Sequence, residues 1–222
     1  MKKNFFLLLS LTFFQSSLFA QCGSGACPPG ALTTLPAGGT IDAGTTYCIS
    51  GTINNTTAYT VNGTLIIQSG SVTVGDLTVG KTGSIIVNGG GRLIAGSYTG
   101  EATAPASVVS NVTVCTNGYL YFSGAINPGE TNFTLNDYGM FVIHGSWSTI
   151  INATWFKLGM GSIVEMCSSF IFQTSTGFFT ETSGGPSYVV TRGAMANYAG
   201  SGYLSTLGAG SQIQWDISGG PV

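Results

Sequence analysis

Asn62-Gly63-Thr64-Leu65-Ile66-Ile67 is a short apolar run that begins at a glycine, and the chain repeats this pattern four more times. The glycines of the five runs are residues 63, 83, 118, 139 and 161, which gives spacings of 20, 35, 21 and 22. A period of 20–22 residues that holds two or three short strands is typical of a solenoid, in which each period forms one coil. Crossovers between parallel strands are almost always right-handed. The sequence therefore predicts an all-β fold, a right-handed parallel β-helix of about 20–22 residues per coil.

The composition agrees with a solenoid and excludes several other classes of protein. Only 6% of the 222 residues are charged, the net charge is −2, and 34 residues are glycine. With so few basic residues the chain cannot form a nucleic-acid surface that binds phosphates. Its 43% hydrophobic content and low net charge exclude intrinsic disorder. A β-sandwich is the competing all-β fold, but it would show no regular glycine spacing.

Residues 1–20 have the pattern of a secretory signal peptide. Lys2 and Lys3 precede an apolar run over residues 5–14, and Ala20 supplies a small residue before a cleavage site. The chain is therefore expected to be secreted, to the extracellular space, the outer cell surface or the periplasm. A lipid anchor on Cys22 is an alternative, although Gln21 before it is not small. Beyond the signal no stretch has the roughly 18 apolar residues of a membrane span.

The repeat suggests four segments in the chain. Residues 1–20 are the signal peptide, 21–50 form an N-terminal cap, 51–175 form the coils, and 176–222 form a C-terminal cap or flanking element. The long spacing of 35 predicts a side loop at about 96–107, because insertions into solenoids leave as loops. A cap that fails to cover the last strand would leave an edge for self-association.

Five cysteines follow the signal, and export permits disulfides. Cys22, Cys27 and Cys48 are close enough in sequence to form a disulfide, with its pairing left open. Cys115 and Cys167 lie in apolar runs and are expected to be buried thiols. We expect neither a metal site nor a cofactor, because only Cys22 and Cys27 have the spacing of metal ligands and the only histidine, His144, is far from them.

Ligand-binding candidates come from the aromatic residues, which concentrate after residue 118. We expect the phenylalanines to fill a wider core. Tyrosine and tryptophan also carry a polar atom, so an exposed row of them would suit the flat faces of sugar rings. Asp137 and Glu165, about one coil apart, are acids that a glycosidase-like pair would need close together. The candidate residues are Tyr119, Tyr138, Trp147, Trp155, Asp137 and Glu165.

The N-G-x-L-x-I spacing at 62–67 and the G-S-x-x-V spacing at 83–87 resemble secreted right-handed β-helix proteins of Gram-negative bacteria, of pectin-lyase-like and filamentous-haemagglutinin-like architecture. The resemblance covers residues 50–175 and implies the fold. This architecture hosts lyases, hydrolases and adhesins alike. The polygalacturonase motifs Asn-Thr-Asp, Asp-Asp, Gly-His-Gly and Arg-x-Lys are missing.

We therefore expect no catalytic residues and no enzymatic activity. The expected function is that of a cell-surface or extracellular protein, adhesin-like or structural, whose partner is an extracellular polysaccharide or a host or cell-surface component. The alternative is a carbohydrate-active protein, either a polysaccharide-binding module or a divergent polysaccharide lyase or hydrolase. A third interpretation is a short relative or a fragment of a larger adhesin.

Overall fold

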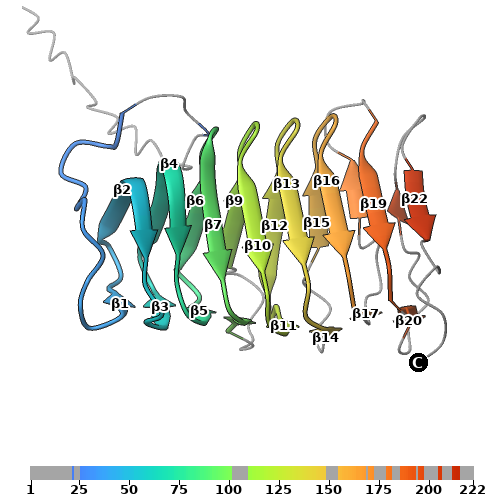
Figure 1. Cartoon of the computed structure of the whole chain (residues 1–222), viewed down its shortest axis with the longest axis horizontal. Coiled ribbons are helices and arrows are strands. Elements are labelled where there is room, and N and C mark those ends of the chain that lie inside the picture. The colour runs from blue at the N-terminus through green and yellow to red at the C-terminus, as the bar shows by residue number, and fades with distance from the viewer. Residues whose placement is uncertain are drawn as a thin grey trace, which may run out of the picture.

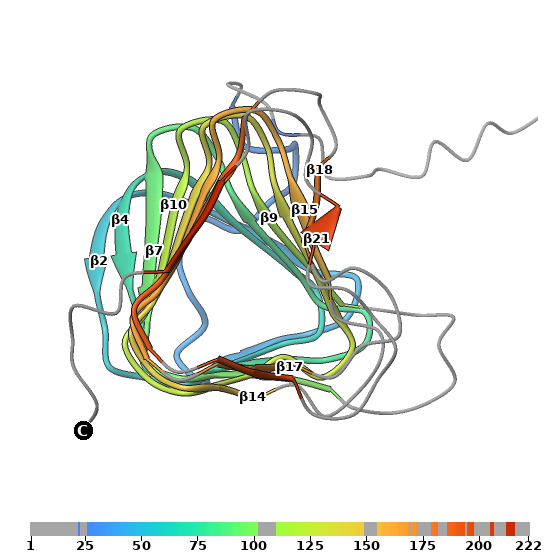
Figure 2. The same cartoon turned by 90° about the vertical axis from the view of Figure 1, so that its right-hand side faces the viewer.

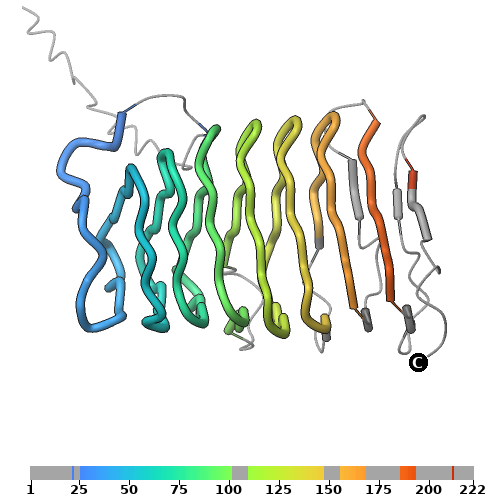
Figure 3. The backbone as a smooth tube through the Cα atoms, viewed as in Figure 1, coloured from blue at the N-terminus to red at the C-terminus, as the bar shows by residue number. Residues whose placement is uncertain are grey.

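A computed structural model describes Cys22 and residues 26–101, 110–148, 155–168, 170–172, 179–181, 186–193, 195–197, 205–206 and 212–215. These residues form strands and turns, and none of them is helical. Every paired strand runs parallel to its neighbours, and the coils follow one another along a single axis (Figures 1 and 3). The expected β-solenoid is thus confirmed.

Each coil has three sides, so the stack has a triangular cross-section (Figure 2). One side, which we call the threonine face, is an eight-stranded sheet whose outward positions include Thr40, Thr60, Thr78 and Thr99 in register. Its strands are, in order, β1 (Thr40–Ile41), β3 (Tyr59–Val61), β5 (Leu77–Val79), β8 (Tyr98–Gly100), β11 (Ile126–Asn127), β14 (Trp147–Ser148), β17 (Phe170–Phe172) and β20 (Met195–Asn197).

The other two sides are joined at their first coils, because β2 (Thr46–Asn54) and β4 (Thr64–Thr73) continue around the corner between them. The strap face contains residues 46–49 and 64–67 of these strands, followed by β6 (Ser84–Val87), β9 (Ser110–Val114), β12 (Thr131–Leu135), β15 (Trp155–Leu158), β18 (Phe179–Glu181) and β21 (Ser205–Thr206). The tyrosine face contains residues 50–54 and 70–73, followed by β7 (Gly91–Ala95), β10 (Tyr119–Phe122), β13 (Met140–Ile143), β16 (Ile163–Met166), β19 (Tyr188–Thr191) and β22 (Gln212–Trp215).

The handedness follows from the view along the axis. In Figure 2 the chain passes from the tyrosine face on the left through the threonine face below to the strap face on the right, for example from β7 through β8 to β9. It turns anticlockwise while it advances towards the viewer, from β2 to β22. This is a right-handed coil, as the crossover rule predicts.

The core fills the inside of the coils with inward-facing residues. The first coils contribute aliphatic side chains such as Ile49, Val61 and Leu65. Later coils contribute rings with centroids 5.0–5.6 Å apart, in edge-to-face and stacked contacts. The expected aromatic core is thus confirmed for the phenylalanines whose side chains the structure describes, Phe122, Phe133, Phe141 and Phe156. The buried rings among the described residues are Tyr59, Tyr98, Phe122, Phe133, Phe141, Trp147 and Phe156.

The coils extend beyond the expected limits of 51 and 175. β1 and β2 already pair with the following coil. At the other end β18 to β22 continue the same parallel ladders, so 176–222 is not wholly a cap. Coils pair through their backbones, so a coil can form without the glycine motif. The sequence predicts a coil only where that motif is clear, and the coils at both ends were therefore missed.

The spacing of 35 also has a different cause from the one expected. Gly83 precedes a strand of the strap face, whereas Gly118 precedes a strand of the tyrosine face, so the two glycines mark different corners. In the observed register Thr64 pairs with Ser84, 20 residues later, and Ser84 pairs with Asn111, 27 residues later. The insertion in this coil is therefore about seven residues.

The side loop expected at 96–107 is correspondingly shorter. Tyr98–Gly100 forms β8, and Tyr98 is fully buried in the core. The remainder of the expected loop, residues 102–107, lies outside the described residues.

Candidate functional site

The four aromatic residues expected in one exposed row lie in different places. Tyr119 is half-buried on the tyrosine face. Tyr138 lies in a corner turn and is 54% exposed. Trp155 belongs to β15 on the strap face, and its side chain is outside the described residues. The predicted row is therefore not formed.

Trp147 corrects the prediction most directly, because only 1% of it is exposed. It stands in register with Ile126, an inward position of the threonine face. Its ring lies 5.6 Å from that of Phe133 and 5.4 Å from that of Phe156. Trp147 therefore fills the core, where large rings occupy the width that aliphatic residues leave in the first coils.

Asp137 and Glu165 are not brought together either. The Asp137 carboxylate accepts a hydrogen bond from the backbone N–H of Met160 in the next coil, at 2.9 Å. The Glu165 carboxylate lies in the middle of β16 and pairs with Arg192, with 2.7 Å between Oε1 and Nε. Each acid thus contributes to contacts between coils, and the two do not form the pair that glycoside hydrolysis uses.

The exposure of Tyr138 follows from the corner turn at residues 136–139. The N–H of Gly139 donates to the carbonyl of Asn136, which closes a four-residue turn. Tyr138, the third residue of this turn, has a positive φ of 59°, as the third residue of a type II turn does. The turns of neighbouring coils have Asn117 and Gly161 at this position, with φ of 60° and 68°. The side chain at this position points away from the core.

The tyrosine face carries two outward rows that run along the axis. In the first row Arg92 stands in register with Tyr119, and its guanidinium lies 4.7 Å from the ring centroid. Burial raises the pKa of Tyr119, while the charge of Arg92 lowers it. The first row is Arg92, Tyr119, Met140, Ile163 and Tyr188, and the second is Ile94, Tyr121, Val142, Glu165 and Val190.

Most members of these rows are half-buried by their neighbours, while Tyr188 is 37% exposed. The surface is apolar and aromatic, and its Glu165 is already paired with Arg192. Of the predicted candidates it contains only Tyr119 and Glu165. The alternation in Tyr119-Leu120-Tyr121-Phe122 is the sequence signal that could have added Tyr121.

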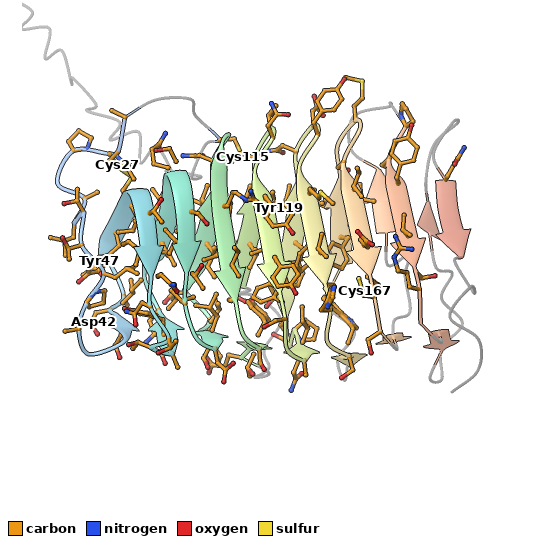
Figure 4. The ribbon with its side chains drawn as sticks, viewed as in Figure 1. Cys27, Asp42, Tyr47, Cys115, Tyr119 and Cys167 are labelled. Carbon is orange, nitrogen blue, oxygen red and sulfur yellow. A yellow bond between two sulfur atoms is a disulfide. The ribbon has the colours of Figure 1, made fainter. Side chains whose placement is uncertain are left out.

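A third row lies just beyond the carboxyl ends of the strands of the tyrosine face, where His144 follows β13 and Cys167 follows β16. The His144 ring lies 5.5 Å from the ring of Tyr121. Cys167 lies on the next coil and is a free thiol (Figure 4). Burial, and then the charge of Glu165, raise the pKa of Cys167, so that the thiol is protonated at neutral pH. No group of three potential metal ligands occurs among the described residues.

The cysteines form two disulfides that cross the strap face. Cys27 pairs with Cys48, and Cys22 pairs with Cys115. The expectation that Cys115 is a free thiol is thus wrong. The Cys22–Cys115 disulfide was not predicted from the sequence, because the two cysteines are separated by 93 residues. The sulfur of Cys22 is engaged in this bond, which leaves no thiol for a lipid anchor.

Cys22 and residues 26–32 form a segment that we call the strap. It covers an outward apolar row of the strap face, in which Cys48, Ile66 and Ile86 are almost fully buried. Leu32 then adds one bridge to the edge of β2: its N–H donates to the carbonyl of Thr46, and its carbonyl accepts from the N–H of Cys48. The strap therefore covers both a face and part of the first edge.

No protein-family model, curated protein or solved structure matches this chain. Within the described residues no helix is long and apolar enough to cross a membrane. The tyrosine face, defined by the two outward rows above, is therefore the candidate functional site.

Proposed function

We propose that this chain is a secreted, non-catalytic protein of the extracellular space or cell surface, adhesin-like or structural, that makes its contacts through the tyrosine face. The observation that carries the proposal is the pair of apolar and aromatic rows on a parallel sheet. The signal-peptide pattern and the resemblance to secreted β-helix proteins of Gram-negative bacteria support export. The structural engagement of Asp137 and Glu165 supports a role without catalysis.

Export and catalysis are tested on the chain produced with its own residues 1–20. We expect the mature protein to begin at Gln21 and to be recovered outside the cytoplasm with two disulfides, by mass spectrometry. Incubation with a panel of polysaccharides should release neither reducing ends nor unsaturated products. Retention of a reduced chain in the cytoplasm, or product from any glycan, would overturn the corresponding part of the proposal.

Contact through the tyrosine face is tested by retention of labelled protein on intact cells. The variant Tyr188→Asp places a charge at the most exposed ring of the first row. We expect about tenfold weaker retention, which corresponds to a loss of about 1.4 kcal/mol of binding free energy. A loss of this size is typical of an interface residue that contributes moderately to binding. The control Thr78→Asp alters an exposed position of the threonine face and should leave retention unchanged.

Polysaccharide binding is the second candidate function, because Tyr119 and Tyr188 belong to the same outward row. Tyrosine rings stack on the apolar faces of sugars, and tyrosine hydroxyls can bond to sugar hydroxyls. Co-sedimentation with insoluble glycans distinguishes this candidate from protein contact. Binding that is lost in Tyr188→Asp and kept in Thr78→Asp would favour it, and absence of binding to every glycan would exclude it.

A further inference from the structure

We infer that the tyrosine face packs against the tyrosine face of a second copy of this chain, so that the protein is a face-to-face dimer. The inference rests on the proposed function in one respect: it takes this face as the contact surface and names its partner. It is argued from the two outward rows, from comparison with the other faces, and from the coil repeat.

The three faces of the coil differ in how their outward apolar residues are covered. On the strap face the strap buries Cys48, Ile66 and Ile86. The threonine face presents threonines such as Thr60 and Thr78, which need no cover. On the tyrosine face no segment that the structure describes crosses the rows (Figure 1). The fold thus covers one apolar face internally and leaves the other for an external partner.

The residue types of the rows are those of a protein interface. Interface centres are enriched in tyrosine, methionine and arginine and depleted in lysine and acidic residues. The first row contains Tyr119, Met140 and Tyr188, with Arg92 stacked on the first of these rings. The aliphatic residues of the two rows, among them Val142 and Ile163, have no ring that could stack on a sugar. This composition favours a protein partner over a glycan.

The coil repeat favours a second copy over another protein. Neighbouring parallel strands are about 4.8 Å apart, and packed sheets are about 10 Å apart with their side chains interdigitated. Rows on two copies have the same repeat, so side chains of one can enter the gaps of the other coil after coil, as identical side chains do in steric zippers. A partner without this repeat could match only one or two coils.

Charge permits such self-association. Glu165 and Arg192 neutralise each other within one copy. Arg92 is the other charged residue in the two rows, and its guanidinium already lies over the Tyr119 ring. Two tyrosine faces can therefore meet while each of these charges keeps its contact within its own copy, whereas an unpaired buried charge would be costly.

Sedimentation velocity of the full secreted chain over a concentration series tests the dimer. We expect a dimer at micromolar concentration in the natural chain. Met140→Lys introduces a charge in the middle of the first row and should weaken association by at least 100-fold. The matched control Thr78→Lys, on the threonine face, should leave the dimer unchanged. Circular dichroism and the melting temperature check that both variants fold, and Tyr188→Lys at the more exposed ring replaces Met140→Lys if the latter does not.

Other outcomes overturn the inference in distinguishable ways. A natural chain that is monomeric at every concentration overturns the dimer, and so does a dimer that persists in both tyrosine-face variants. A dimer that disappears in Cys167→Ser is an intermolecular disulfide, which also overturns it. A monomer that still binds cells or polysaccharide, and loses this binding in Tyr188→Lys, would retain the proposed function while excluding the second copy.

Discussion

Trp147 shows what a single residue contributes to the width of the coil. It is buried and contacts the rings of Phe133 and Phe156. Replacement by alanine removes these contacts and leaves a cavity, so we expect Trp147→Ala to lower the free energy of unfolding by about 3–5 kcal/mol. Guanidinium unfolding followed by circular dichroism measures this.

The control for this prediction is Tyr138→Ala, at the exposed position of a corner turn. It should cost about 1 kcal/mol or less, as surface substitutions usually do. If Trp147→Ala were as mild as the control and abolished retention on cells instead, Trp147 would be a contact residue after all.

Cys167 gives a second prediction at the scale of the residue. Burial and the Glu165 charge hold its pKa above the ordinary value of 9.0. Alkylation by iodoacetamide should therefore be slow at pH 8 and increase as the pH rises beyond 9. Glu165→Gln removes a cause of the raised pKa and should speed alkylation at pH 8, whereas Arg192→Gln should slow it.

The same shift has a consequence for stability. The folded chain favours the protonated thiol, and this preference contributes fully to the free energy of unfolding below pH 9. The contribution is lost as the pH rises through the folded pKa, because the thiol of the unfolded chain ionises first. A Cys167→Ser variant should lack this component of the pH dependence. Equal alkylation rates in the natural chain and both neighbouring variants would contradict the assigned cause.

Single residues also show why the site was only partly predictable. Alternation within one strand tells inward from outward positions, and it places Leu120 inside and Tyr119 outside as observed. Trp147 lies in a strand of two residues, where alternation gives no direction. Its orientation depends on register with Ile126 and Phe170, which a single sequence does not reveal.

At the scale of elements, the strap is stabilised by its two disulfides to different extents. Cys22–Cys115 joins residues 93 apart and Cys27–Cys48 joins residues 21 apart. In the chain-entropy model these closures contribute about 4–5 and about 3 kcal/mol. We expect the double variant Cys22→Ala/Cys115→Ala to lower the free energy of unfolding by more than Cys27→Ala/Cys48→Ala. Cys167→Ser is the control and should change it little at neutral pH.

Loss of the strap should also be visible without unfolding. When the strap detaches, Ile66 and Ile86 become accessible to water, so the variants should bind the dye ANS while their β-sheet circular dichroism persists. Equal stability of the two double variants, or no increase in dye binding, would indicate that the strap does not hold the coils.

The strands also show why the alignment of coils predicted from the glycine repeat was wrong. Glycine followed by an apolar run occurs at two corners of the triangle, before β4 and β6 on one side and before β10 and β13 on the next. Both corners need tight turns, so both select the same residues. The fold class, the parallel stacking and the coil length were therefore predictable, whereas the alignment between coils 84–91 and 111–118 required the strand register.

For the molecule as a whole, the strap should change how the coils open. In a solenoid each coil contacts only its neighbours, so opening normally spreads from an end. Here Cys115 holds Cys22 of the strap and Cys48 holds Cys27, so that the strap links the coils between Cys48 and Cys115. We expect the amides of β2, β4, β6 and β9 to exchange with a common opening free energy in the oxidised chain.

Native-state hydrogen exchange measures this opening. In Cys22→Ala/Cys115→Ala the protection of the same strands should become graded, with β2 the first to open and β9 the last. A gradient that is already present in the oxidised chain would mean that the disulfides do not couple the coils.

During the export that we propose, the bond between Cys22 and Cys115 would set an order of events. A chain that is translocated from its amino end delivers Cys22 early, yet its partner follows 93 residues later. Until then the thiol of Cys22 can pair prematurely with Cys27 or Cys48, the two cysteines that precede Cys115 in the sequence. A premature disulfide of Cys22 can reach the natural pairing only by thiol–disulfide exchange, in which a free thiolate such as that of Cys115 attacks the premature bond and releases the other cysteine as a thiol.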